Sequence, residues 1–253
     1  MDPERLARAV AGAHRRRTDL VPGGRVVEVD GLAIQASGLP DPSMNFCVVE
    51  HEPNEPALAL GAAEAALAAI GMPFGIDLPL GLFPDLERAI RDRGYRRLLG
   101  RQVMAATVGP LPALAPPWGA EIDRVSGDGD LEALAAVDSE VFETDVAVSR
   151  GLYSRPMVGA TDIVLLLARL EGVPVGGALG VRVDATVGVF GVGVVAASRR
   201  RGLGGALTCA AARAVGMPDD VAWLFPSEQA RPLYERLGFV AADAWEVWVG
   251  PAA

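Results

Sequence analysis

The stretch that decides the fold is Val194-Val195-Ala196-Ala197-Ser198-Arg199-Arg200-Arg201-Gly202-Leu203-Gly204-Gly205-Ala206-Leu207. Before it, an apolar run with several glycines begins at 186 and indicates a buried strand. After it, apolar and alanine positions recur at helical spacing from 203 to 215. The start of a helix offers unpaired N–H groups and the positive end of its dipole, and glycines let this backbone approach a ligand closely. The stretch therefore predicts a strand, a loop and a helix that together bind an anion such as a pyrophosphate.

Two other phosphate-binding motifs fit this stretch less well. A P-loop requires a lysine followed by serine or threonine, and all 23 basic residues of this chain are arginine. The run Gly191-Val192-Gly193-Val194-Val195-Ala196 does match the dinucleotide pattern G-x-G-x-x-A. The helix that this pattern opens would then carry Gly202, Gly204 and Gly205 in its interior. Each glycine would destabilise the helix by up to about 1 kcal/mol relative to alanine. A nucleotide- or NAD-binding protein is therefore an alternative that only the six residues from Gly191 to Ala196 support.

Arg199-x-x-Gly202-x-Gly204 resembles the acyl-CoA pyrophosphate loop of the GNAT acetyltransferase superfamily. A second stretch, Ser227-Glu228-Gln229-Ala230-Arg231-Pro232-Leu233-Tyr234-Glu235-Arg236-Leu237-Gly238-Phe239, is similar to the family's other signature. The two stretches follow each other in the family's order and at roughly its spacing. The resemblance covers approximately Ala120 to Val249, about half the chain. It implies an α/β fold with a mixed, twisted sheet and flanking helices.

The resemblance also implies which residues bind the co-substrate, acetyl-CoA. Main-chain groups of Val194 and Ala196 would hydrogen-bond the pantetheine arm, and the loop and helix start would bind the pyrophosphate. Arg199 would hold the loop or a phosphate oxygen, since its planar guanidinium suits both roles. The predicted cofactor-binding residues are Val194, Val195, Ala196, Arg199, Arg200, Arg201, Gly202, Leu203, Gly204, Gly205, Ala206, Ser227 and Tyr234. Three positions depart from the family pattern: Ala196 replaces a frequent proline, Arg200 a frequent glycine and Ser227 a common asparagine.

For catalysis, the resemblance implies that Tyr234 is the general acid that protonates the departing thiolate. A tyrosine side chain ordinarily titrates near pH ~10, so it is protonated at neutral pH and can donate; the alternative is a tyrosine that only packs under the cofactor. The run 186–195 carries no carboxylate or histidine that could be a general base. Glu143 and Asp145, with the neighbouring Glu140, are candidates for the acceptor side. A water chain could equally carry the proton, and a solvated acidic cluster is the more common interpretation of such acids.

These observations predict an N-acetyltransferase that moves an acetyl group from acetyl-CoA to a primary amine of a small molecule or peptide, by direct attack. The alternative is a non-catalytic acyl-CoA-binding or regulatory module, because no carboxylate stands on the strand before the loop.

The composition indicates which kinds of binding partner and which cellular compartment are expected. The net charge of −9 argues against general nucleic-acid binding and favours a cationic substrate. Two isolated cysteines (Cys47, Cys209) and two isolated histidines (His14, His51) indicate neither a disulfide framework nor a metal site. No apolar run reaches the ~18 residues of a membrane span, so we expect a cytoplasmic protein that is a monomer or a homodimer. The bias toward arginine, alanine and glycine is typical of GC-rich coding and suggests a bacterial source.

The first half contains a segment that mirrors the end of the chain. Residues 86–95 form a candidate helix that closes in Gly94-Tyr95, as the second signature closes in Gly238-Phe239. This half is either a degenerate GNAT-like domain or a coincidental helix–glycine–strand unit, two interpretations of about equal weight. Its first helix is expected from Pro3 to about His14. Prolines between 110 and 119 indicate a linker, which gives an N-terminal α/β domain (1–109), a Pro-rich linker (110–119) and a GNAT acetyltransferase domain (120–253).

Overall fold

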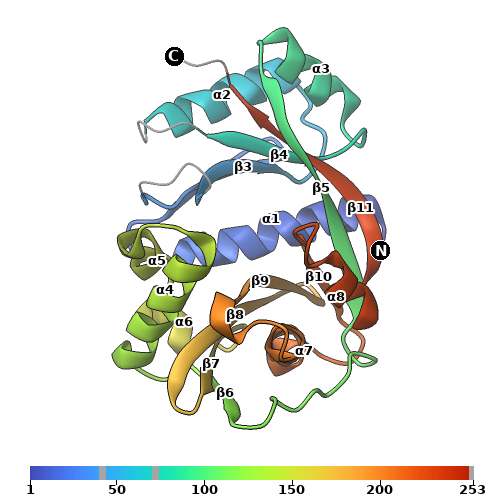
Figure 1. Cartoon of the computed structure of the whole chain (residues 1–253). Helices are drawn as coiled ribbons and strands as arrows, with labels where there is room; N and C mark the ends of the chain where they lie inside the picture. The colour runs from blue at the N-terminus through green and yellow to red at the C-terminus, as the bar shows by residue number, and fades with distance from the viewer. Residues whose placement is uncertain (40–43, 70–73, 251–253) are drawn as a thin grey trace. The chain divides into compact units, whose positions relative to one another are not determined.

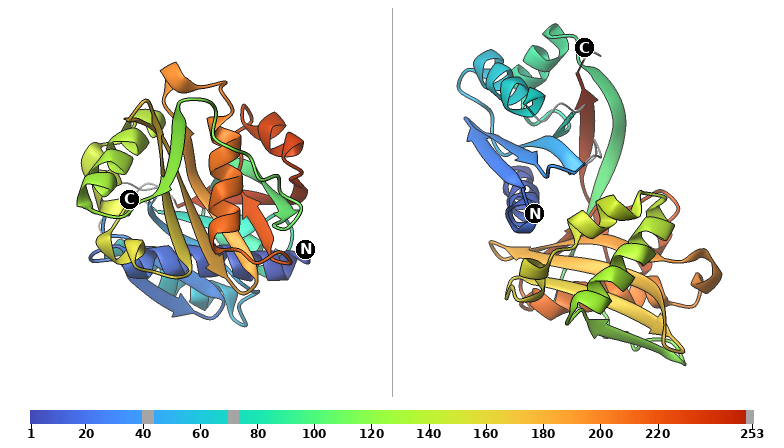
Figure 2. Two further views of the ribbon diagram at one scale, coloured as in Figure 1. Left: turned by 90° about the horizontal axis from the view of Figure 1, so that it is seen from below. Right: turned by 90° about the vertical axis from the view of Figure 1, so that its left-hand side faces the viewer.

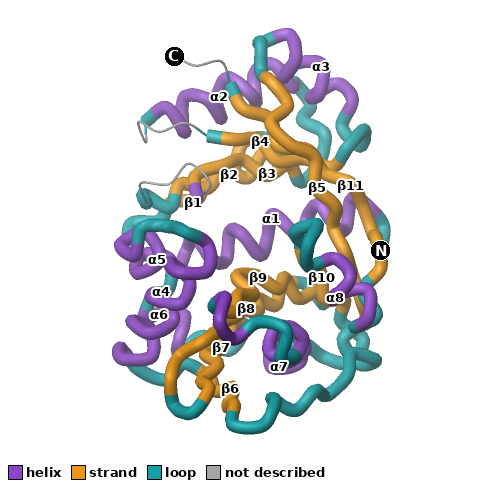
Figure 3. The backbone as a smooth tube through the Cα atoms, in the orientation of Figure 1, coloured by secondary structure: helices purple, strands orange, loops and turns teal. Residues whose placement is uncertain are grey.

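The computed structural model describes residues 1–39, 44–69 and 74–250. The chain folds into two compact units, of which the first comprises Met1–Val103 with Ala241–Ala253 and the second Met104–Val240 (Figure 1). Both units combine helices with strands of one sheet each, which confirms the predicted α/β class (Figure 3). None of the helices in the described ranges is long and apolar enough to cross a membrane.

In its described residues, the first unit contains a mixed sheet and the α-helices α1, α2 and α3. Along the chain its elements are α1 (Pro3–Leu20), β1 (Arg25–Val29), β2 (Leu32–Ala36), β3 (Asn45–Val49), α2 (Pro56–Ala68), β4 (Gly75–Pro79), α3 (Pro84–Asp92), the first part of β5 (Arg96–Thr107) and nearly all of β11 (Val240–Val249). Its strands lie in the order β1-β2-β3-β4-β11-β5. The β3–β4 pair is parallel, whereas β11 runs antiparallel to β4.

Helix α1 is longer than the sequence predicted. It begins as expected, with the Asp2 carboxylate accepting a hydrogen bond from the backbone N–H of Arg5 and with proline in the first turn. It then continues beyond His14 to Leu20. The first arginine of this run, Arg15, is paired with Glu28 of β1 and with Glu50, the residue after β3.

The second unit carries the predicted strand–loop–helix. Its elements are the end of β5, β6 (Ala120–Arg124), α4 (Asp128–Phe142), α5 (Val146–Leu152), α6 (Arg155–Val158), β7 (Ile163–Leu170), β8 (Val173–Val183), β9 (Thr186–Val194), the 3₁₀ turn η2 (Ala196–Ser198), α7 (Leu203–Val215), β10 (Val221–Leu224) and α8 (Arg231–Arg236). Its strands lie in the order β5-β10-β9-β8-β7-β6. The predicted helix from 203 to 215 is confirmed, and the short helix α6 was not predicted.

The final strands of the two halves are exchanged between the units. In each half a helix (α3 or α8) ends at a glycine with positive φ, Gly94 at 78° and Gly238 at 96°, and a buried aromatic residue leads into a strand. The strand after α3 is β5, whose end pairs antiparallel with β10 in the second unit. The strand after α8 is β11, which pairs with β4 in the first unit. The similarity of the segments around Gly94 and Gly238 therefore reflects the same local fold.

The units differ from the boundaries that the sequence suggested. The prolines between 110 and 119 belong wholly to the second unit, where their segment runs alongside helix α7. One Arg213 guanidinium nitrogen donates to the carbonyl oxygens of Gly109 (3.4 Å) and Leu111 (3.0 Å), and the Leu111 side chain is buried. Residues after 240 belong to the first unit, because β11 lies in its sheet. The prolines thus mark a packed segment of one unit.

Helices α7 and α4 cover opposite faces of the second unit's sheet (Figure 2). Neighbouring residues of a strand point to opposite faces. A Cβ atom on Gly176 would lie 3.1 Å from the Leu207 side chain of α7, whereas one on Gly177 would collide with Leu134 of α4. The close packing of α7 on one face and of α4 on the other therefore depends on these two glycines of β8.

Candidate functional site

The start of α7 is a backbone anion site. Gly202 caps the helix with φ 90° and no side chain occupies the cap, so the N–H groups of the first turn lack a side-chain acceptor. The first bond within the helix runs from the Ala206 N–H to the Gly202 carbonyl. Arg199, Arg200 and Arg201 are all exposed beside this end. Backbone donors, the helix dipole and three positive charges thus converge where a pyrophosphate was expected.

Arg199 holds the loop closed. Its Nε donates to the carbonyl oxygen of Val194, the last residue of β9, at 2.9 Å. Between them, the Ser198 N–H donates to the carbonyl of Val195 within the η2 turn. Of the two roles expected for Arg199, the structure therefore contains the loop contact.

Arg200, which stands where the family frequently has glycine, adopts φ 61°. This left-handed conformation is the one that glycine adopts without a steric penalty, whereas other L-residues enter it at about 1–2 kcal/mol. The departure in residue type therefore leaves the loop in a glycine-like conformation. Ala196, the other departure in the loop, begins the η2 turn.

Strands β9 and β10 separate beyond Gly188. Their parallel pairing covers Thr186, Val187 and Gly188, and in the second unit, all of which is described, it extends no further. On its other side β9 stays paired with β8, and the Val195 N–H donates to the Val175 carbonyl there. Because alternate residues of an antiparallel strand direct their N–H groups to opposite sides, the Val194 N–H points away from β8, into the gap that β10 leaves.

Gly191 interrupts β9 with a bulge. Its φ is 57°, and the register with β8 shifts at this point. Glycine inside a strand often marks such a bulge, because it has no side chain to pack.

Tyr234 lies buried on α8. Burial raises the pKa of its hydroxyl, and a hydrogen bond with Thr208 partly offsets the rise. The Thr208 hydroxyl in turn donates to the Gly204 carbonyl at 2.8 Å, which links Tyr234 to the first turn of α7. Ser227 has a different contact, because its hydroxyl accepts a hydrogen bond from the Ala230 N–H (3.3 Å) at the start of α8.

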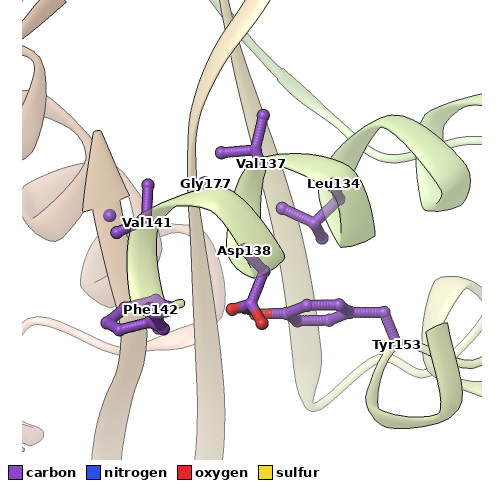
Figure 4. Close-up of a pocket in the computed structure, with 9 residues that line it drawn as sticks. Leu134, Val137, Asp138, Val141, Phe142, Tyr153 and Gly177 are labelled. Carbon is purple, nitrogen blue, oxygen red and sulfur yellow. Dashed lines mark hydrogen bonds between the residues drawn. The ribbon is translucent and has the colours of Figure 1, made fainter. Parts of the chain in front are cut away.

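A small pocket lies on the α4 face of the sheet, against the bulge (Figure 4). The pocket is lined by Leu134, Val137, Asp138, Val141, Phe142, Tyr153, Gly177, Gly191 and Gly193. Its carboxylate is Asp138, only 8% exposed, which accepts hydrogen bonds from the hydroxyls of Tyr153 (2.6 Å) and Ser149 (2.7 Å). Figure 4 shows the Tyr153 ring directed at this carboxylate.

The two acids expected on the acceptor side do not line this pocket. Glu143 is exposed and ends α4 in a left-handed conformation, and Asp145 caps α5 by accepting from the Ala147 N–H at 2.7 Å. Asp138, which does line the pocket, was not among the site residues predicted from the sequence. The available signal was a carboxylate four residues after Leu134, on the helical stripe that faces the sheet.

The first unit has an acidic segment where the second has its cationic loop. Between β3 and α2, the carboxylate of Asp30 accepts from the backbone N–H groups of Asn54 (2.8 Å) and Glu55 (3.4 Å). Glu52 accepts from the Leu86 N–H at 2.7 Å, and burial raises the pKa of this carboxyl. The Asp30 carboxylate therefore takes two backbone donors of this segment and disfavours a pyrophosphate there.

The fold and this geometry define an acyl-CoA N-acyltransferase architecture. Residues 161–241 match the family model described as "Acetyltransferase (GNAT) domain", a range that contains β9, the loop, α7 and α8. The resemblance seen in the sequence is therefore confirmed over residues 161–241, which match a GNAT domain. The family range ends one residue beyond the second unit.

Solved structures match nearly the whole chain. A GCN5-related N-acetyltransferase from Kribbella flavida shares 24% identity with a TM-score of 0.75, over 99% of this chain and 96% of that one. A putative GNAT-family acetyltransferase from Novosphingobium aromaticivorans shares 21% identity (TM-score 0.62) over 100% of both chains. A tandem GNAT protein from the clavulanic acid biosynthesis pathway shares 15% (TM-score 0.59) over 89% of this chain and 80% of that one. The search of curated proteins found no matching sequence.

Identities this low establish a shared fold alone. Because the matches extend over the first unit, that unit also has a GNAT-like fold. Of the two interpretations of the first half, the GNAT-like one is thus supported.

Proposed function

We propose that the protein is an acetyl-CoA-dependent N-acetyltransferase that acts on a primary amine, with Tyr234 as general acid. The observation that carries this proposal is the uncapped start of α7 beside the point where β9 parts from β10. A long donor with a diphosphate at one end suits this arrangement, since the helix start favours the phosphates and the free edge of β9 favours an amide-bearing arm. The GNAT domain match over the same residues supports it.

In the proposed cofactor site, backbone groups provide more of the contacts than side chains do. N–H groups from Arg201 to Gly205 face the pyrophosphate, whereas the Ala206 N–H is bonded within the helix to the Gly202 carbonyl. The exposed Arg200 and Arg201 add positive charge around the pyrophosphate. Arg199 keeps the loop in place through Val194. Val194, Val195 and Ala196 lie along the pantetheine arm, with the Val194 N–H directed into the gap.

In the transfer step, the amine nitrogen attacks the thioester carbonyl carbon, the C–N bond forms and the C–S bond breaks. The Val194 N–H stabilises the developing oxyanion, because a fixed backbone dipole costs no reorganisation. The Tyr234 hydroxyl protonates the departing thiolate. Its raised pKa suits an acid, since the hydroxyl stays protonated across the neutral and mildly alkaline range.

The proposal assigns one cofactor to each chain, in the second unit. The Asp30 and Glu52 carboxylates at the corresponding place in the first unit argue against a second. It also assigns the protein to the cytoplasm, which agrees with Cys47 and Cys209 being free and buried thiols.

Calorimetric titration with acetyl-CoA tests the proposal. We expect micromolar binding to the parent and none to Gly204→Glu, whose carboxylate would occupy the anion site. A Cβ at this position would lie 3.4 Å from Leu233, so the variant is expected to fold. Gly129→Glu is the matched control, because it places the same acid in the first turn of α4, in open space.

The titration and a transfer assay separate the possible results. Equal binding by parent and Gly204→Glu, or no binding by the parent, would reject the acyl-CoA site, and NAD would then be the next ligand to titrate. Binding without release of CoA thiol for any amine would favour the non-catalytic acyl-CoA-binding module.

A further inference from the structure

Helix α8 packs directly against the first turn of α7. A Cβ atom on Gly204 would lie 3.4 Å from the Leu233 side chain of α8, and one on Gly205 would lie 3.7 Å from Leu237. Thr208 follows Gly204 by one helical turn, so the two residues lie on the same face of α7. The Thr208 side chain carries the single hydroxyl group of α7, and it is fully buried on the face that α8 covers.

Thr208 links the proposed acid to the cofactor-binding turn. Its hydroxyl donates to the Gly204 carbonyl at 2.8 Å and is also hydrogen-bonded to the Tyr234 hydroxyl. A threonine hydroxyl has one proton to donate and two lone pairs that accept. Because its proton is used in the bond to Gly204, the Thr208 oxygen accepts the proton of Tyr234 in the resting protein.

The Tyr234 side chain is held in a packed environment. It is only 7% exposed, and its ring contacts the Phe239 ring edge-on, with the ring centroids 5.9 Å apart. Loss of the Tyr234 proton leaves a phenolate here, and a buried charge is costly unless a donor faces it. The hydrogen bond with Thr208 lowers the pKa of Tyr234 against the larger effect of burial, as expected for a donor to the phenolate.

We infer that Thr208 is a positioning residue for the general acid, and that its hydroxyl donates to the Tyr234 oxygen once Tyr234 has protonated the thiolate. This inference rests on the proposed acetyl transfer, with Tyr234 as its acid. The proton of Tyr234 passes to the sulfur atom of CoA, and the Thr208 hydroxyl turns from the Gly204 carbonyl to the phenolate oxygen. The nitrogen that forms the amide releases one proton to solvent, and solvent returns one proton to Tyr234.

Thr208→Val tests the inference, because it replaces the hydroxyl by a methyl group of similar size. Release of thiol from acetyl-CoA measures the transfer, and O-methylhydroxylamine is the acceptor because it is small and uncharged at neutral pH. We expect Thr208→Val to lower kcat about tenfold, since a hydrogen bond to a charged oxygen is lost in the transfer step. KM for acetyl-CoA should change by less than about twofold, and Thr208→Ser should keep at least about half of the parent's kcat.

A double-mutant cycle with Tyr234→Phe distinguishes a positioning role from a structural one. No phenolate forms in Tyr234→Phe, so adding Thr208→Val should lower kcat by less than about a further twofold. Should Thr208→Val not fold, Thr208→Ala replaces it in the cycle.

Thr186→Val is the matched control. Thr186 is buried like Thr208, and its hydroxyl also donates to a backbone carbonyl, that of Val183, at 2.7 Å. The substitution therefore makes the same chemical change in the same unit without touching Tyr234. It is expected to leave kcat within about twofold of the parent's value.

Three results would overturn the inference. In the first, Thr208→Val lowers kcat by the same factor with and without the Tyr234 hydroxyl, which would make Thr208 a brace between α7 and α8. In the second, Thr208→Val leaves kcat unchanged. In the third, Thr208→Ser is as impaired as Thr208→Val. Failure of the parent to bind acetyl-CoA or to release its thiol would instead reject the proposed function, and the inference with it.

Discussion

The Arg199 guanidinium donates to the Val194 carbonyl at 2.9 Å and ties the anion-binding loop to the end of β9. The loop and the strand that carries the Val194 N–H are therefore fixed to each other by one side chain. We expect Arg199→Gln to lower the free energy of unfolding by about 1 kcal/mol and to raise the Kd for acetyl-CoA about tenfold. Chemical denaturation and calorimetry measure the two effects.

Arg201→Gln is the control for this prediction, since Arg201 is exposed and its substitution removes charge without that bond. It should weaken binding in a salt-dependent way and leave stability unchanged. Equal stability of the Arg199 and Arg201 variants would contradict a role of Arg199 in holding the loop.

Tyr234→Phe is expected to lower kcat by about 100-fold and to leave the Kd for acetyl-CoA unchanged, because it removes a proton donor and little packing. Burial raises the pKa of Tyr234, so the acid is lost only as the pH rises above the usual range of a tyrosine. The parent should therefore show no loss of activity from this group below pH ~10. Turnover by Tyr234→Phe at the parent's rate would reject the assignment.

Arg200→Gly tests the conformation of the loop. The left-handed φ of Arg200 costs about 1–2 kcal/mol that glycine avoids, while glycine makes the unfolded chain more flexible by up to about 1 kcal/mol. We expect Arg200→Gly to be about 1 kcal/mol more stable than Arg201→Gly, since Arg201 lacks a positive φ and gains nothing from glycine. Thermal unfolding of the pair measures the difference. The same stability for both would show that the strain at Arg200 is negligible.

His14 makes the stability of the protein sensitive to acid. Burial, together with the charges of Arg17 and Arg101, holds the pKa of His14 well below its usual range. The unfolded chain takes up a proton near pH ~6.5 that the folded chain does not, so stability falls as the pH drops below that value. His14→Gln should flatten this dependence in denaturation curves between pH 7 and 5. His51→Gln, at an exposed position, should keep the parent's slope.

The helices and strands around the loop could be predicted from the sequence, because each is marked by a local pattern of residues. Glu171-Gly172 and Asp184-Ala185 both take positive φ at two successive residues, the hairpin turn that delimits β7, β8 and β9. Helix α7 was predictable in the same way, since alanine and leucine spacing follows the capping Gly202. The predicted loop residues from Arg199 to Ala206 lie together for the same reason.

The pocket carboxylate and the strand pairing were beyond such signals. Asp138 is a pocket residue because it is hydrogen-bonded to Tyr153, which is 15 residues away and outside its helix, and because β9 has a bulge at Gly191. The alternation of a strand such as β11 shows that it has a partner but does not say which strand that is. Both features are set by tertiary contacts, which no local pattern encodes.

The exchange of β5 and β11 has a consequence for dividing the chain. A cut at Pro110 would leave the fragment after it without the Met104–Thr107 segment that pairs with β10. The fragment before it would lack β11, whose Trp245 and Trp248 are buried against the first unit. Each piece would expose an unpaired strand edge and part of a core, so the two pieces should be soluble only when they are produced together. The two halves have similar folds, yet neither contains all the strands that its own unit needs.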